Sequence, residues 1–293
     1  MSLPYLTQAQ APLTSEIEAV NEFGELQKVS IPAERALTVY VDKRELVTLM
    51  TLGANPELLV LGYLRNQRLI KHVTDIESIT VDWDVGAAAV KTRHGIDDIE
   101  ANTARRVVTT GCGQGSVFGG LMDEVDQIEL PAGAFITQSQ LYSLVNTIRL
   151  KETTYKSAGS VHACALFSTA SGDSDMLLFV EDVGRHNAID TIAGWMWMQA
   201  NSSLNDASHV FYTTGRLTSE MVIKSAQMGV PVVVSRSGIT QMGHQVAQSV
   251  GLCAIGRATN KRFLCYTHAE RLRLQPDAVS VSLPPSPSGR GLG

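Results

Sequence analysis

Residues 210–235, VFYTTGRLTSEMVIKSAQMGVPVVVS, decide the fold class. Residues 210–213 and 232–235 are short apolar runs rich in β-branched and aromatic side chains, which is typical of buried strands. Residues 219–228 between them have the length and apolar spacing of a helix, and Gly229 and Pro231 mark its end. The stretch therefore predicts a strand, a helix and a strand in succession, as in an α/β layer.

The same alternation continues on both sides of this unit. A helix is predicted over residues 137–148, where Thr137 and Gln140 have the spacing of a capping box. Further strands and helices are expected at residues 163–167, 176–180, 187–200, 241–250, near 253 and at 263–266. We therefore expect an α/β layer over residues 136–272, with largely parallel strand pairing.

The amino-terminal part has another pattern. Residues 37–41 and 45–50 predict a β-hairpin, and a helix beginning at Pro56 is expected to pack on it. Residues 79–85 and 88–92 predict two more strands. We divide the chain into an extended or partly ordered arm, a smaller α+β subdomain, the α/β layer and a disordered tail rich in Pro, Ser and Gly, at residues 1–30, 31–135, 136–272 and 273–293.

Composition excludes several classes of function. The net charge is −5 and the basic residues are dispersed, which argues against a nucleic-acid partner. The apolar runs are too short to span a bilayer and residues 1–5 do not resemble a signal segment, so no membrane association and a cytoplasmic location are expected. The spacing of the four cysteines matches no zinc site, so we expect reduced thiols and no metal.

Arginine recurs where the predicted strands end. Arg185, Arg216 and Arg236 follow three strands, and residues 257–262 follow a fourth, each beside Gly, Ser or Thr. The carboxyl ends of parallel strands meet at one edge of a sheet. There the guanidinium groups of arginine, which make bidentate hydrogen bonds, can bind an oxyanion together with backbone amides and hydroxyl groups. This edge is therefore predicted to bind phosphate or pyrophosphate.

Cys112 lies in the glycine-rich segment TTGCGQGS, residues 109–116, just after a predicted strand at residues 105–108. Glycines suit a mobile loop that presents a reactive thiol. A small buried cysteine is the other interpretation, and the loop by itself leaves both open. The three remaining cysteines, Cys164, Cys253 and Cys265, lie in apolar strand-like runs and are predicted to pack in the core.

Several motifs, taken in order, resemble the formate dehydrogenase accessory sulfurtransferases, or FdhD-type sulfur carriers, over residues 34–272. The motifs are Glu34 with LTVYV 37–41, GCG 111–113, GSVHA 159–163, EDVGRHNAID 181–190, GRLTSEMV 215–222, VSRS 234–237 and YTH 266–268. The resemblance implies a cytidine-deaminase-like α/β layer without zinc, in a homodimer.

The same resemblance implies a sulfurtransferase. Cys112 would accept sulfur from a cysteine desulfurase as a persulfide and pass it to the molybdenum bis(molybdopterin guanine dinucleotide) cofactor for formate dehydrogenase. The anion at the sheet edge would then be this guanine dinucleotide or a GDP-like ligand. Its binding segment would fall on Arg257, Ala258, Thr259, Asn260, Lys261 and Arg262.

Gly115 departs from the family pattern, because many members have a second cysteine there. This excludes an internal disulfide relay through the loop, but a carrier needs only one nucleophilic thiolate. The missing thiol also keeps an alternative open, in which the protein is a chaperone that delivers the molybdenum cofactor without sulfur transfer.

Overall fold

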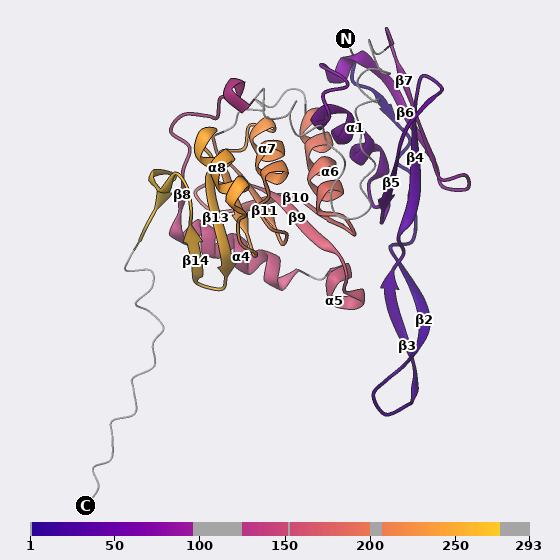
Figure 1. Ribbon diagram of the computed structural model, residues 1–293, viewed down its shortest axis with the longest axis horizontal. Helices are drawn as coiled ribbons and strands as arrows, with labels where there is room; N and C mark the ends of the chain where they lie inside the picture. The colour runs from indigo at the N-terminus through magenta and orange to yellow at the C-terminus, as the bar shows by residue number, and fades with distance from the viewer. Residues whose placement is uncertain (1, 96–124, 152, 200–206, 276–293) are drawn as a thin grey trace, which may run out of the picture.

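The computed structural model describes residues 2–95, 125–151, 153–199 and 207–275. Two larger sheets organise these residues, one in each part of the chain (Figure 1). The predicted mixed α/β class is confirmed. The predicted strand at residues 105–108 and the Cys112 segment lie outside the described residues, as does the tail beyond residue 275.

The carboxyl-terminal part contains a six-stranded sheet in the order β10-β9-β11-β12-β13-β14. Its strands are β9 (His162–Ser168), β10 (Asp175–Asp182), β11 (His209–Thr213), β12 (Val232–Ser235), β13 (Cys253–Thr259) and β14 (Arg262–Cys265). Only the central pairs, β11 with β12 and β12 with β13, are parallel within this sheet. The expectation of largely parallel pairing is wrong. Short loops join β9 to β10 and β13 to β14 and allow only antiparallel neighbours, and β9 is also antiparallel to β11.

Helices cover both faces of this sheet. One face packs on α6 (Arg185–Met198), α7 (Ser219–Gln227) and α8 (Gln241–Ser249), and the other packs on α4 (Gln138–Leu150). The capping box predicted at the start of α4 is present, because the Thr137 side chain accepts from the Gln140 amide and the Gln140 side chain accepts from the Thr137 amide. A short helix, α5 (Thr154–Ala158), was not predicted.

The amino-terminal part contains a five-stranded sheet in the order β1-β6-β7-β4-β5. Its elements are β1 (Tyr5–Leu6), β4 (Arg35–Val41), β5 (Arg44–Thr51), β6 (Ile76–Asp82), β7 (Ala87–Thr92) and the covering helix α1 (Pro56–Asn66). The predicted hairpin is confirmed as β4 and β5, and the predicted strand pair as β6 and β7. Small elements complete the fold: η1 (Val73–Asp75), η2 (Val125–Gln127), β8 (Ile136–Thr137), η3 (Ala269–Arg271) and β15 (Leu272–Arg273).

The predicted arm contains a β-hairpin that the sequence pattern did not indicate. Strands β2 (Thr14–Val20) and β3 (Leu26–Pro32) form a hairpin that projects from the body (Figure 1). Asn21 stabilises the turn, since its side-chain oxygen accepts from the amides of Phe23 and Glu25. The hairpin was missed because most of its residues are exposed or half-buried, so neither face produces the apolar alternation of a buried strand.

Helices α1 and α6 join the two parts, and two glycines allow their backbones to meet. A Cβ on Gly62 would lie 1.7 Å from the Asp190 carbonyl oxygen, and one on Gly194 would lie 2.0 Å from the Leu58 carbonyl oxygen. Beside this contact, the Asn66 amide nitrogen donates to the Asp190 carboxylate at 2.7 Å. Lys224 Nζ lies 2.9 Å from the same carboxylate, which is fully buried. The junction is therefore closely packed and contains a buried ion pair.

Among the described helices, none combines the length and apolarity that a bilayer-spanning segment needs.

Candidate functional site

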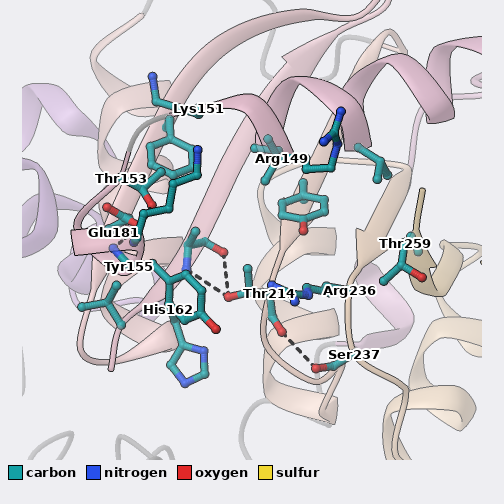
Figure 2. Close-up of a pocket in the computed structure, with 18 of the residues that line it drawn as sticks. Arg149, Lys151, Thr153, Tyr155, His162, Glu181, Thr214, Arg236, Ser237 and Thr259 are labelled. Carbon is teal, nitrogen blue, oxygen red and sulfur yellow. Dashed lines mark hydrogen bonds between the residues drawn. The ribbon is translucent and has the colours of Figure 1, made fainter. Parts of the chain in front are cut away.

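A cavity of about 610 Å³ lies at the edge of the six-stranded sheet where β10, β11 and β12 end and β9 begins. Its lining comes from these strand ends, from the last turns of α4, from α5 and from the loop between β13 and β14 (Figure 2). Part of the wall is apolar or aromatic, with Ile148, Phe179 and Tyr212 among the lining residues. The cavity therefore occupies the edge that the strand-end arginines predicted.

Cations outnumber anions around this cavity. Its lining includes Arg149, Lys151, Lys156 and Arg236, against one carboxylate, Glu181. The Lys151 ammonium lies 5.0 Å from the centre of the Phe179 ring, a cation–π contact that holds the charge at the wall. The excess of positive charge suits an anionic ligand.

The Glu181 carboxylate is already used by the protein. Its oxygens accept from the backbone amides of Thr154 at 2.6 Å and Tyr155 at 3.2 Å, which are the first amides of α5. A carboxylate in this position satisfies amides that would otherwise lack a partner at a helix start. Glu181 therefore fixes α5 against β10 and is itself partly neutralised by these amides.

Hydroxyl groups hold the loops that follow β11 and β12. Thr214 Oγ1 accepts from the Ala163 amide at 3.0 Å, and Ser237 Oγ donates to the Thr214 carbonyl at 2.9 Å (Figure 2). The buried Ser235 hydroxyl donates to the Gly215 carbonyl at 2.7 Å. These bonds connect the loop after β12, which carries Arg236, to the loop after β11. The backbone that positions the Arg236 guanidinium is therefore held in place.

His162 lines the cavity at the start of β9. Burial lowers its pKa from the usual 6.5, and the charges of Arg185 and Arg216 lower it further. Its imidazole is therefore neutral near pH 7, with one ring nitrogen available as a hydrogen-bond acceptor. Arg185 and Arg216 thus act on the electrostatics of the edge, although neither lines the cavity.

The predicted binding segment is divided by the structure. Ala258, Thr259 and Asn260 line the cavity together with Arg236. The other members of the segment, Arg257, Lys261 and Arg262, are exposed and lie outside the lining. Cys112 lies outside the described residues.

Three cavity cations were not predicted from the sequence: Arg149, Lys151 and Lys156. They lie near the end of α4, directly after it, and on α5. The only sequence signal was a pair of basic residues around a predicted helix end. Such a pattern is ordinary, because cations stabilise the carboxyl end of any helix.

Cys164 packs in the core as predicted. Its side chain is fully buried, and burial raises the pKa of its thiol to about 12. A thiol in this state is a poor nucleophile. Within the described ranges, His, Cys, Asp and Glu side chains form no group of three that could hold a metal ion.

His186, buried at the start of α6, makes stability depend on pH. Burial lowers its pKa from 6.5 to about 2, and the charges of Lys224, Arg185 and His162 lower it in the same direction. This holds even though a Glu220 carboxylate oxygen lies 3.4 Å from His186 Nε2. Below about pH 6.5 the unfolded chain binds a proton on this imidazole that the folded chain does not. The free energy of unfolding is therefore unaffected by this imidazole above about pH 6.5, and it decreases as the pH falls below that value.

We expect His186 to remove about 1–2 kcal/mol of the free energy of unfolding between about pH 6.5 and pH 5. Urea unfolding at several pH values, for the wild type and for His186→Gln, measures this. The variant should lose stability less steeply over this range, and an unchanged slope would contradict the assignment.

The structure thus defines a class: a mixed α/β protein with a basic cavity at the carboxyl edge of its larger sheet. The chain belongs to the FdhD/NarQ family, whose model matches residues 32–273. The resemblance found in the sequence is confirmed.

Named relatives match most of the chain. A protein of Bacillus subtilis (strain 168), named sulfur carrier protein FdhD, is 32% identical over 254 residues, which cover 86% of this chain and 94% of that protein. A Bacillus licheniformis protein of the same name is 32% identical over 253 residues, covering 85% and 93%. A crystal structure named as that of a formate dehydrogenase accessory protein, from Desulfotalea psychrophila, has a TM-score of 0.69 at 22% identity, covering 89% and 100%. This last similarity supports the fold.

Proposed function

We propose that this chain is a sulfur carrier in the maturation of formate dehydrogenase. The observation that carries the proposal is the similarity to the two Bacillus proteins named as sulfur carriers, which extends over more than nine tenths of each of them. In the proposed reaction the Cys112 thiolate attacks the terminal sulfur of a persulfide on a cysteine desulfurase. A persulfide forms on Cys112, and the desulfurase cysteine leaves as a thiolate.

The cargo in this proposal is the molybdenum bis(molybdopterin guanine dinucleotide) cofactor, to which the persulfide sulfur is passed. The cavity suits its phosphates, because guanidinium and ammonium groups are the usual partners of phosphate oxygens. Arg236, Arg149 and Lys151 would bind the phosphates, and Thr259 and Asn260 would add hydrogen bonds. The neutral imidazole of His162 adds no charge to this set.

Three further expectations belong to the same proposal. The larger sheet would follow the cytidine-deaminase type of layering, which is supported by its central parallel strands and its helices on both faces. The protein would be a homodimer, and it would act in the cytoplasm.

The phosphate part of the proposal predicts a loss of GDP affinity when a cavity cation is removed. Arg236→Ala should weaken GDP binding by about 10-fold to 100-fold, because a charge-assisted hydrogen bond contributes about 1.5–3 kcal/mol. Isothermal titration with GDP measures this. Arg93→Ala, which removes an exposed arginine directly after β7, is the matched control and should bind GDP as the wild type does. Equal affinities for all three proteins would contradict this placement.

Gly115 favours a second candidate, the cofactor chaperone, because it removes one of the two thiols that many relatives have in the loop. The two candidates differ in one respect: only the carrier needs Cys112. Activation of the client enzyme, formate dehydrogenase, by a Cys112 variant therefore separates the carrier from the chaperone.

A further inference from the structure

Two thiols lie close together at the base of the last hairpin of the larger sheet. Cys253 begins β13 and Cys265 ends β14, and these strands are antiparallel neighbours. Their Sγ atoms lie 3.8 Å apart, and both cysteines are free. Cys265 pairs with Ile255, so Cys253 is its diagonal neighbour. Closing the 3.8 Å gap to the disulfide length of about 2.0 Å therefore requires a local shift of the two strands as well as rotation of the two side chains.

The two thiols differ in access and in acidity. Cys253 is fully buried, whereas Cys265 is partly exposed on β14, the last strand of the sheet (Figure 1). The hydrogen bond from Cys253 lowers the pKa of Cys265, and the same bond together with burial raises the pKa of Cys253. This is the asymmetry of a reactive dithiol, in which the accessible thiol attacks first and the buried thiol reacts second.

The position of the pair connects it to the cavity. The chain between the two cysteines carries Ala258, Thr259 and Asn260, which form part of the cavity wall. Its backbone is irregular, with a register shift between Gly256 and Thr259. Arg257 and Asn260 adopt left-handed φ values of 52° and 51°. A cross-link at the base of this hairpin would restrict how that wall can move.

We propose that Cys253 and Cys265 form a redox-active dithiol that closes to a disulfide at the base of the β13–β14 hairpin. The oxidant is a low-molecular-weight disulfide such as oxidised glutathione. The Cys265 thiolate attacks one of its sulfurs, forming a mixed disulfide and releasing one glutathione thiolate. The Cys253 thiol then loses its proton and attacks Cys265 Sγ, which completes the protein disulfide and releases the second glutathione.

The full-length chain carrying Cys112→Ser provides the test, because the loop thiol is then absent. The protein is incubated with oxidised glutathione, alkylated and analysed by intact mass and peptide mapping. We expect the loss of two hydrogen atoms and a peptide in which Cys253 is bonded to Cys265, while Cys164 is alkylated only after denaturation. Two unmodified thiols, or a glutathione adduct that persists on Cys265, would overturn the proposal.

A second variant traps the intermediate. With Cys253→Ser added, the resolving thiol is gone, and we expect one stable glutathione adduct on Cys265. With Cys265→Ser instead, we expect no adduct on the buried Cys253, and an adduct there would contradict the assigned order. The peptide map of the parent protein decides the central point even where either variant fails to fold.

The coupling of this dithiol to the cavity rests on the proposed function. GDP titrated against the reduced and the oxidised protein should give affinities that differ several-fold, and equal affinities would overturn the coupling. If neither form binds GDP while the disulfide still forms, the proposed phosphate site fails and the dithiol stands.

Discussion

A Cys112→Ala variant is expected to leave formate dehydrogenase as inactive as it is in cells that lack this protein. The reason is chemical: residues 109–116 contain a single thiol, so Cys112 is the one sulfur in the segment that can form a persulfide. The measurement is formate dehydrogenase activity in cells whose only copy of the protein carries the substitution.

Cys164→Ala is the matched control for this experiment. It removes a thiol that is fully buried and whose pKa is raised to about 12, so it should leave client activity near the wild-type level. Full client activity with Cys112→Ala would favour the cofactor chaperone over the sulfur carrier.

Asp190→Ala should lower the free energy of unfolding by about 3 kcal/mol, because it removes the nearer carboxylate of the buried Lys224 ammonium and leaves the more distant Glu220 carboxylate at 3.8 Å. The side chains of Lys224 and Asp190 are 1% and 0% exposed, so the ion pair is shielded from solvent. The same change removes the acceptor of the Asn66 side chain. Urea unfolding monitored by circular dichroism measures the loss.

Glu77→Ala is the matched control for this effect. It breaks an ion pair of similar length, 2.7 Å to Lys91, in which both side chains are exposed. An exposed pair contributes less than about 1 kcal/mol, so the control should stay close to the wild type. A similarly small effect for Asp190→Ala would contradict the view that this buried pair holds the junction together.

Local sequence signals predicted most of the regular elements. The β-branched run 232–234 and the Thr137–Gln140 capping box each depend on interactions within a few residues, and both were placed correctly. Strand direction could not be predicted in the same way, because it depends on how the chain returns after each strand. The turn between β9 and β10 is closed by the Gly172 amide, which donates to the Thr169 carbonyl, and apolar periodicity does not report such a turn.

The longest motif of the resemblance proved largely structural. Within residues 181–190, the Asp182 carboxylate accepts from Thr51 Oγ1 and the Leu52 amide, and Asn187 donates to the Met50 carbonyl at 2.6 Å. These bonds connect the end of β5 to the start of α6. A sequence shows the polar side chains but not their distant partners, so such residues are easily taken for ligand-binding groups.

Part of the cavity lining follows from the sequence and part does not. The position of Arg236 follows from the strand that precedes it, and the carboxyl edge of a sheet is a general place for ligands. Lys151 lines the cavity because the end of α4 lies at the same edge of the sheet, and only the packed structure shows this.

Sulfur loading of the intact protein tests the central claim most directly. The chain is incubated with a cysteine desulfurase and cysteine, separated without reductant and weighed by mass spectrometry. The sulfur-carrier account predicts that the wild type gains the mass of at least one sulfur atom and that Cys112→Ala gains none. A wild-type protein without added sulfur, or an equal gain on Cys112→Ala, would contradict it.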